Sequence, residues 1–197
     1  MEKIFKTYIH IIKTFLDGYL SLILFESIYT RLIKLRMRTS DDILITTVFV
    51  STYNTAVLML SNLINPNPDS IDCFYLINII RENRKSYSDP HYEKLEEEIS
   101  NFESYLNENT KFAERIKTIR DKHVGHLDRK HVNDPSSIEL DLPIKFGEIN
   151  DHYSLIREHL QRIGPLIDPD ADPSGPLALL DQPTDLLTKK AEVLFDS

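Results

Sequence analysis

The sequence predicts an all-α fold: a helical bundle of about five helices over residues 1–164, followed by a proline-rich arm over residues 165–197. Only five of the 197 residues are glycine, too few for the many tight turns of an all-β chain. Apolar residues recur at three- and four-residue spacing, which is the period of one helix face. With 41% hydrophobic and 27% charged residues, the chain can bury a substantial core.

The first two helices are expected over residues 3–37 and 41–64. The apolar stripe of the first comprises Ile4, Tyr8, Ile11, Ile12, Phe15, Tyr19, Leu22 and Ile23. Ser40, followed by two aspartates, is the expected N-cap of the second. Residues 43–64 carry no charge and are long enough to span a bilayer, but their many hydroxyl and amide groups favour a central bundle helix. We therefore expect no membrane partner.

The third and fourth helices follow a stretch, residues 65–70 (NPNPDS), in which two prolines exclude a helix. Asp69 is expected to cap the third helix, which passes through Ile71, Ile77, Ile80 and Arg84. Asp89 and Pro90 are the expected N-cap and first residue of the fourth helix. Its inward positions are Leu95, Ile99, Phe102 and Leu106.

The fourth helix is expected to break near residues 107–110 and then to resume with a new apolar stripe. That stripe comprises Phe112, Ile116, Ile119 and His123. After a loop with two prolines, a last bundle helix is expected over residues 146–163. Its inward positions are Ile149, Tyr153, Ile156, Leu160 and Ile163. Five of the ten prolines then fall in residues 165–183, which predicts a linker or wrapping arm with a short helix at 184–195.

Cysteine usage and the N-terminal segment both bear on the compartment. Cys73 is the only cysteine, so no disulfide can form within the chain, and its apolar neighbours indicate a buried thiol. The first twenty residues contain Asp17 and no small-residue cleavage site, so we expect no signal peptide. A cytoplasmic protein is the resulting expectation.

Charge is unevenly distributed along the chain, whose net charge is −8. Residues 110–131 hold seven basic and three acidic side chains, so this segment carries +4 and the remainder −12. A positive segment of this kind attracts a phosphate backbone. A second basic group, formed by Arg31, Lys34, Arg36 and Arg38, is more typical of a solvated helix face.

Residues 120–130 (RDKHVGHLDRK) concentrate arginine and histidine, and two interpretations without RNA chemistry are open. In the first, His123, His126 and His131, with Asp128, bind a metal ion. The usual helical zinc motif spaces two histidines four residues apart beside a glutamate, and that pattern is missing, so we expect no metal or other cofactor. In the second, the basic residues only interact favourably with the negative end of the helix dipole.

A third interpretation is RNA cleavage without a metal. Histidine transfers protons near neutral pH, and arginine holds a phosphate through fixed, permanently charged donors. Arg120 and His126, separated by five residues that begin with Asp121, resemble the motif of the HEPN superfamily of ribonucleases. More narrowly, the run IRDKHVGHLDRK resembles the HEPN proteins of abortive-infection and toxin–antitoxin systems. The resemblance covers roughly residues 1–165.

That resemblance implies an all-α, usually dimeric endoribonuclease that cleaves RNA without a metal. Since no convincing set of metal ligands is present in the sequence, we expect cleavage to leave 2′,3′-cyclic phosphate ends. Arg120 would stabilise the scissile phosphate, His126 would be the general acid and base, and Asp121 would orient one of them. The RNA-binding residues would be Lys117, Lys122, Arg129 and Lys130. RNA, a second copy of the chain and a nucleotidyltransferase-type antitoxin are the implied partners. The alternative is a non-catalytic HEPN-like RNA-binding or scaffold protein.

Helix geometry bears on how the motif could work. On one ideal helix, His126 lies about 120° around the axis and ~9 Å along it from Arg120, so the two do not share a face. Either Gly125 breaks the helix and turns His126 round, or two chains share the site. We therefore expect a homodimer with both motifs at its interface, with Val124 and Leu127 supplying apolar surface.

Overall fold

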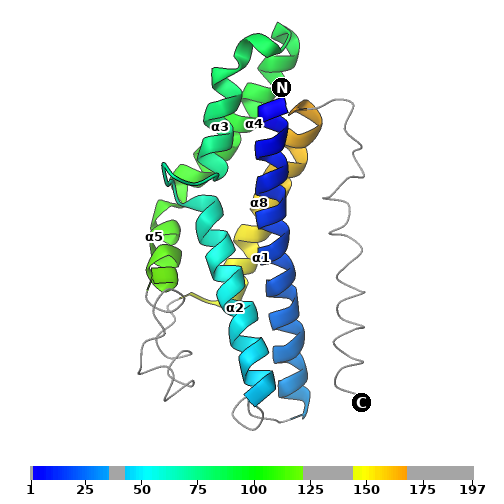
Figure 1. Cartoon of the computed structure of the whole chain (residues 1–197), viewed down its shortest axis with the longest axis vertical. Coiled ribbons are helices and arrows are strands. Elements are labelled where there is room, and N and C mark those ends of the chain that lie inside the picture. Colours follow the sequence, from blue (N-terminus) through cyan, green and yellow to red (C-terminus); the bar gives the residue numbers. More distant parts are fainter. Residues whose placement is uncertain (1, 36–42, 122–143, 168–197) are drawn as a thin grey trace.

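The computed structural model describes residues 2–35, 43–121 and 144–167, and all regular structure in these ranges is helical (Figure 1). The helices are α1 (Glu2–Leu35), α2 (Ile43–Ile64), α3 (Cys73–Glu82), α4 (Asp89–Glu108), α5 (Thr110–Ile119) and α8 (Phe146–Ile167), with one 3₁₀ turn at Arg84–Ser86. The predicted all-α fold class is confirmed.

α1 and α2, which are consecutive in the chain, form a hairpin around which the other helices are arranged (Figure 1). α8 runs along α1 and also contacts α4, while α5 packs against α2 and α4. α3 contacts α1, α2 and α4. The end of the hairpin at which α1 finishes extends beyond the other helices (Figure 1). Large apolar side chains are exposed there: Tyr29, Ile33, Leu44 and Val48.

The apolar stripes predicted for α1, α4, α5 and α8 form the core. The stripe predicted for α3 is only partly right: Ile77 and Ile80 are buried, but Ile71 lies before the helix and is 37% exposed, and Arg84 lies in the 3₁₀ turn after it. Every inward position predicted for α4 and α8 is buried, as are Phe112, Ile116 and Ile119 of α5. In α1 the stripe is buried apart from Tyr19, which is partly exposed and packs against the core. Cys73 is fully buried, as predicted, and burial raises the pKa of its thiol, which makes it a poor nucleophile.

Tyr153 of α8 joins three helices at the centre of the bundle. Its hydroxyl donates a hydrogen bond to the carbonyl of Ala56 on α2 (2.6 Å), and its ring meets that of Phe15 on α1 edge-on (centroids 5.5 Å apart). Gly18 makes this packing possible, because a Cβ there would overlap the Tyr153 hydroxyl and lie 2.7 Å from the Cβ of Met59. A buried tyrosine is tolerated because its polar end is satisfied.

A second tyrosine–glycine contact fixes the far end of α8 against α1. The Tyr8 hydroxyl donates to the carbonyl of Leu160 (2.9 Å), and a Cβ on Gly164 would overlap that hydroxyl. α8 is therefore held along α1 at two points, which matters because α8 in turn holds α5.

The predicted N-cap of α3, Asp69, is wrong. Asp72 is the N-cap: its Oδ1 accepts from the Tyr75 backbone N–H (2.8 Å) and its Oδ2 from the Asn67 N–H (3.0 Å). Asp69 instead lies in the preceding turn, where its N–H donates to the Asn67 side chain (3.1 Å). Asp72 prevails because its carboxylate satisfies the helix and the loop together.

The ends of α4 and α8 also differ from expectation. Ser88 is the N-cap of α4 and Asp89 its first residue, so the predicted cap is one residue late. α8 continues through Pro165 to Ile167, four residues beyond the predicted end, because Ile167 is buried and the Leu166 carbonyl is hydrogen-bonded by the ring of His91 (2.5 Å). Residues 168–197, with the predicted helix at 184–195, lie outside the described residues.

One helix among those described, at Leu44–Ile64 in α2, is long and apolar enough to cross a membrane by length and composition. Helices from protein cores pass the same test. Its C-terminal half faces the core with Tyr53, Ala56, Val57, Leu60, Leu63 and Ile64 buried. The predicted cap of this helix, Ser40, lies outside the described residues.

Candidate functional site

α5 carries the described part of the candidate site. Its buried face packs toward the core, and its other face exposes Lys111 and Lys117. The buried residues are Phe112, Ala113, Ile116 and Ile119. A ten-residue helix is too short to be stable alone, so its orientation depends on what it packs against.

Arg120 and Asp121 form an ion pair where α5 ends. Arg120 keeps helical backbone angles (φ −52°, ψ −50°), and the chain continues through both residues as a π turn, a local geometry common at functional sites. The Nε and Nη2 atoms of Arg120 each lie 2.8 Å from Oδ1 of Asp121. The Arg120 side chain is 25% exposed and that of Asp121 is 54% exposed.

This pairing has a chemical consequence for Arg120. A guanidinium has five N–H donors; among the described residues, Asp121 accepts from the Nε–H of Arg120 and lies at ion-pair distance from its Nη2, and the donors that Asp121 does not contact are those that would bind an anion. The carboxylate also restricts the rotation of a side chain that is otherwise long and flexible. Lys117, one turn earlier and exposed, adds a second positive charge on the neighbouring surface.

The other predicted site residues lie outside the described residues. These are Lys122, His126, Arg129 and Lys130, together with His123, His131 and Asp128 of the metal alternative and the hinge candidate Gly125. The structure thus brings together Lys117, Arg120 and Asp121. The pairing of Arg120 with His126 stays a prediction. Within the described part of the chain, no three histidine, cysteine or acidic side chains gather as a metal site.

Two contacts join α5 to α8, and neither was expected from the sequence. Arg115 and Glu148 form a two-point ion pair (Nη1–Oε1 2.8 Å, Nη2–Oε2 3.2 Å). One turn away on each helix, the Phe112 and His152 rings stack with centroids 3.6 Å apart. α8 therefore fixes the rotation of the helix that carries Arg120.

His152 is also linked to α4, because its Nδ1 lies 2.5 Å from the Tyr105 hydroxyl. Burial lowers the pKa of His152, opposed in part by Glu148 and Asp151, and burial raises the pKa of Tyr105. A neutral imidazole whose Nδ1 accepts from the tyrosine O–H satisfies both groups. The sequence contains a pattern that predicts the burial of His152, since this residue lies three residues after Ile149 and four before Ile156, on the apolar stripe of the helix.

His159 lies two turns further along α8 on the same side. Its ring stacks on Phe102 (4.7 Å between centroids) and meets Tyr105 (5.4 Å). Burial, with a smaller effect from Arg162, lowers its pKa. Its Nδ1 is buried without a hydrogen-bond partner among the described residues. The two histidines thus belong to an aromatic cluster under α4 and α5, and both are suited to the neutral form.

Comparison with known proteins assigns the chain to a family. A HEPN family model, described as AbiU2, matches residues 34–180, about three quarters of the chain, including α5 and the whole candidate motif. No curated protein and no solved structure matches. The match agrees with the all-α architecture and with the position of Arg120 at the end of a basic helix. The chain belongs to the AbiU2 family of HEPN proteins, a family of abortive infection.

Proposed function

We propose that this abortive-infection HEPN protein is a metal-independent endoribonuclease that acts as a toxin or antiviral effector. The observation that carries the proposal is the Arg120–Asp121 pair: an arginine oriented by a carboxylate, at the end of a basic helix and inside the family match. His126 follows at the spacing of the HEPN motif.

The proposed reaction is internal transfer at phosphorus. The 2′-hydroxyl attacks the adjacent phosphate, the bond to the 5′-oxygen breaks, and the products end in a 2′,3′-cyclic phosphate and a 5′-hydroxyl. His126 takes the proton of the 2′-hydroxyl, and an imidazolium returns a proton to the leaving oxygen. The donors of Arg120 that Asp121 does not contact stabilise the charge that develops on the phosphorane.

A shared site makes this chemistry easier. One chain supplies one Arg120 and one His126, whereas two chains related by a two-fold axis supply two of each, so that one histidine is the base and the other the acid. The two +4 segments would together line one cleft and attract RNA to a protein that is otherwise negative. The homodimer is accordingly part of the proposal, as is action in the cytoplasm.

A second candidate is supported by the same ion pair. A carboxylate that engages Arg120 can be a purely structural end to α5, which would suit a non-catalytic RNA-binding or scaffold protein. Expression in a bacterial host separates the two. We expect the parent protein to arrest growth and His126→Ala, at equal protein level, to leave growth unaffected. Equal arrest by both would favour the non-catalytic protein.

A further inference from the structure

The end of the α1–α2 hairpin that extends beyond the other helices carries most of the exposed large apolar side chains of the described residues (Figure 1). This hairpin tip comprises residues 26–34 of α1 and 44–52 of α2. Leu44 and Ile33 expose 68% and 59% of their surface there, beside the exposed Tyr29 and Val48. Soluble proteins rarely leave apolar side chains gathered in this way unless the surface makes a contact. The hairpin tip is therefore a candidate docking surface.

The first half of α2, which lies in the hairpin tip, is apolar without being buried. No residue of the range 44–52 is buried and none is charged. Its apolar side chains are Leu44, Ile45, Val48, Phe49 and Val50. The second half of the same helix, by contrast, packs into the core of the bundle. Because apolar surface is unfavourable in water, the first half gains free energy wherever an apolar environment covers it.

The hydroxyl groups of this part of α2 are satisfied by the helix itself. Thr52 Oγ1 donates to the Phe49 carbonyl (2.9 Å), and Thr55 Oγ1 donates to the Ser51 carbonyl (2.9 Å). A threonine that is hydrogen-bonded to a carbonyl of its own helix needs no water partner, and in this form it is tolerated in an apolar environment. The expectation of no membrane partner rested in part on such hydroxyl groups, so these contacts weaken it.

Positive charge and a pair of stacked rings accompany the apolar side chains of the hairpin tip. Lys34 is exposed in the last turn of α1, and Arg31 lies one turn earlier, whereas Glu26 is the one acidic side chain among the described residues of the tip. The Tyr29 and Phe49 rings stack with their centroids 6.3 Å apart. Tyrosine is enriched where a membrane meets water, and lysine and arginine attract anionic lipid headgroups.

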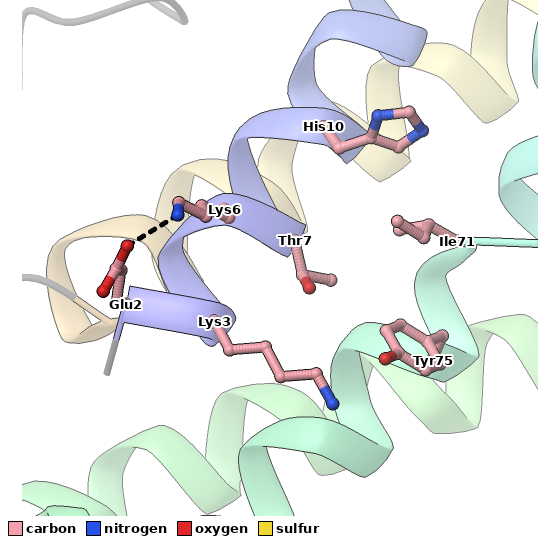
Figure 2. A pocket seen from close by; sticks show the side chains of 7 residues that line it. All are labelled: Glu2, Lys3, Lys6, Thr7, His10, Ile71 and Tyr75. Carbon is pink, nitrogen blue, oxygen red and sulfur yellow. Dashed lines mark hydrogen bonds and ion pairs between the residues drawn. The ribbon is translucent and has the colours of Figure 1, made fainter.

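The opposite end of α1 is charged. A cavity opens there between the first turns of α1 and the start of α3, and charged side chains line its α1 side (Figure 2). The Lys3 ammonium lies 5.9 Å from the centre of the Tyr75 ring, and Lys6 pairs with Glu2 (2.6 Å). Because charged groups are costly to remove from water, this end of the hairpin suits an aqueous environment. The hairpin tip is the end that suits an apolar one.

We propose that the hairpin tip docks on an anionic lipid bilayer, with Leu44 and Ile33 inserted below the headgroups and Lys34 on the lipid phosphates. α2 does not span the bilayer, because its second half is buried in the core. Apolar insertion alone gives only marginal membrane binding, whereas insertion combined with basic side chains gives a stable peripheral contact. The proposal does not depend on RNA cleavage at His126.

A single tryptophan tests the insertion directly, because the chain contains none. The full-length Leu44→Trp variant is mixed with vesicles of phosphatidylglycerol and phosphatidylcholine. We expect its emission to shift to shorter wavelength on addition of vesicles and to be quenched by brominated lipids. Leu155→Trp is the matched control, since Leu155 is an exposed leucine of α8 outside the hairpin tip, and its emission should not change.

Co-sedimentation with the same vesicles separates the apolar contribution from that of charge. The double variant Ile33→Ser, Leu44→Ser should bind about tenfold more weakly or worse, and Leu155→Ser within about twofold of the parent. Lys34→Glu should also weaken binding about tenfold. Lys13→Glu makes the same charge change on an exposed position ~30 Å away along α1, beyond the range of the membrane field, and should bind like the parent.

Two outcomes overturn the proposal. The first is a Leu44→Trp emission that vesicles do not shift, or that they shift no more than the emission of Leu155→Trp. The second is a short-wavelength Leu44→Trp emission without vesicles, which shows that protein covers the hairpin tip. A second copy is then the occupant if the emission changes on dilution, and the chain's own residues are if it does not. Thermal unfolding checks that each variant is folded, which the exposure of the substituted side chains favours.

Discussion

Arg115 of α5 and Glu148 of α8 meet through two parallel contacts of 2.8 and 3.2 Å, five residues before the arginine of the candidate site. Their side chains are 39% and 35% exposed, so the pair contributes only about 0–1 kcal/mol to stability. Its geometric effect is larger, because it fixes the rotation of a short helix. We infer that Arg115 and Glu148 position Arg120 rather than stabilise the fold.

Glu148→Gln tests this positioning role. We expect the free energy of unfolding to fall by less than about 1 kcal/mol, while the kcat of RNA cleavage falls roughly tenfold because Arg120 is misplaced. Glu158→Gln is the control, since it removes an exposed carboxylate paired with Arg162 on the same helix, away from α5. Equal kcat values for the two variants would show that the Arg115–Glu148 pair does not position the site.

Asp121→Ala separates orientation from charge. Removing this carboxylate makes the segment more positive, so we expect RNA to bind as tightly as before or more tightly. The kcat should nevertheless fall about tenfold, because the Arg120 guanidinium loses the partner that holds it. Glu114→Ala makes the same charge change on an exposed position of α5 and should leave kcat unchanged. An Asp121→Ala enzyme with the kcat of the parent removes the orienting role.

His152, which is buried, and His159, which is half-buried, predict a loss of stability in acid. Burial lowers the pKa of His152 and of His159, so unfolded chains bind protons that native chains do not. The pKa of a histidine in an unfolded chain is ~6.5, so the two histidines contribute fully to stability above that pH. Their contribution is lost as the pH falls toward the lowered pKa values of the native state. Urea unfolding at pH 7.5 and 5.5 measures this loss. The double variant His152→Gln, His159→Gln should lose less stability between the two pH values, and an unchanged loss would assign it to other groups.

Two glycines give a matched test of the packing at the centre of the bundle. A Cβ on Gly18 would overlap the Tyr153 hydroxyl, whereas a Cβ on Gly147 would meet nothing within 4 Å. Gly18→Ala should therefore lower the free energy of unfolding by about 1–3 kcal/mol or more. Gly147→Ala should leave it unchanged or raise it by up to about 1 kcal/mol. Denaturant unfolding of the two variants measures both, and a Gly18→Ala variant as stable as the parent would contradict the described contact.

The fold could be predicted because each helix carries its own apolar stripe, which is local information. The start of α3 could not, because Asp69 and Asp72 are both plausible caps and the choice depends on the Asn67 contact. Contacts between side chains of different helices could not be predicted from the sequence either. The Tyr105–His152 hydrogen bond spans 47 residues and the Arg115–Glu148 pair 33, and no pattern in the sequence pairs them.

In the candidate site, too, a contact between neighbours in the chain could be predicted, and a contact that depends on the three-dimensional path of the chain could not. The Arg120–Asp121 contact joins neighbours in the chain, so it follows from adjacency and side-chain length. The meeting of Arg120 with His126 depends on the path of the chain after α5, or on a second copy. Spacing alone does not determine either of these, because six residues along a straight helix would separate the two side chains.

The central claim is tested most directly by incubating the purified full-length protein with RNA in excess chelator. We expect cleavage to persist and to leave 2′,3′-cyclic phosphate ends. His126→Ala and Arg120→Ala should each lower the rate by about 10²-fold or more with thermal unfolding nearly unchanged. Lys13→Ala, which removes an exposed side chain of α1 on a helix that does not carry the motif, should cleave like the parent. Equal cleavage by the parent and His126→Ala, or cleavage only with added Zn²⁺ or Mn²⁺ and bound metal, would contradict the account.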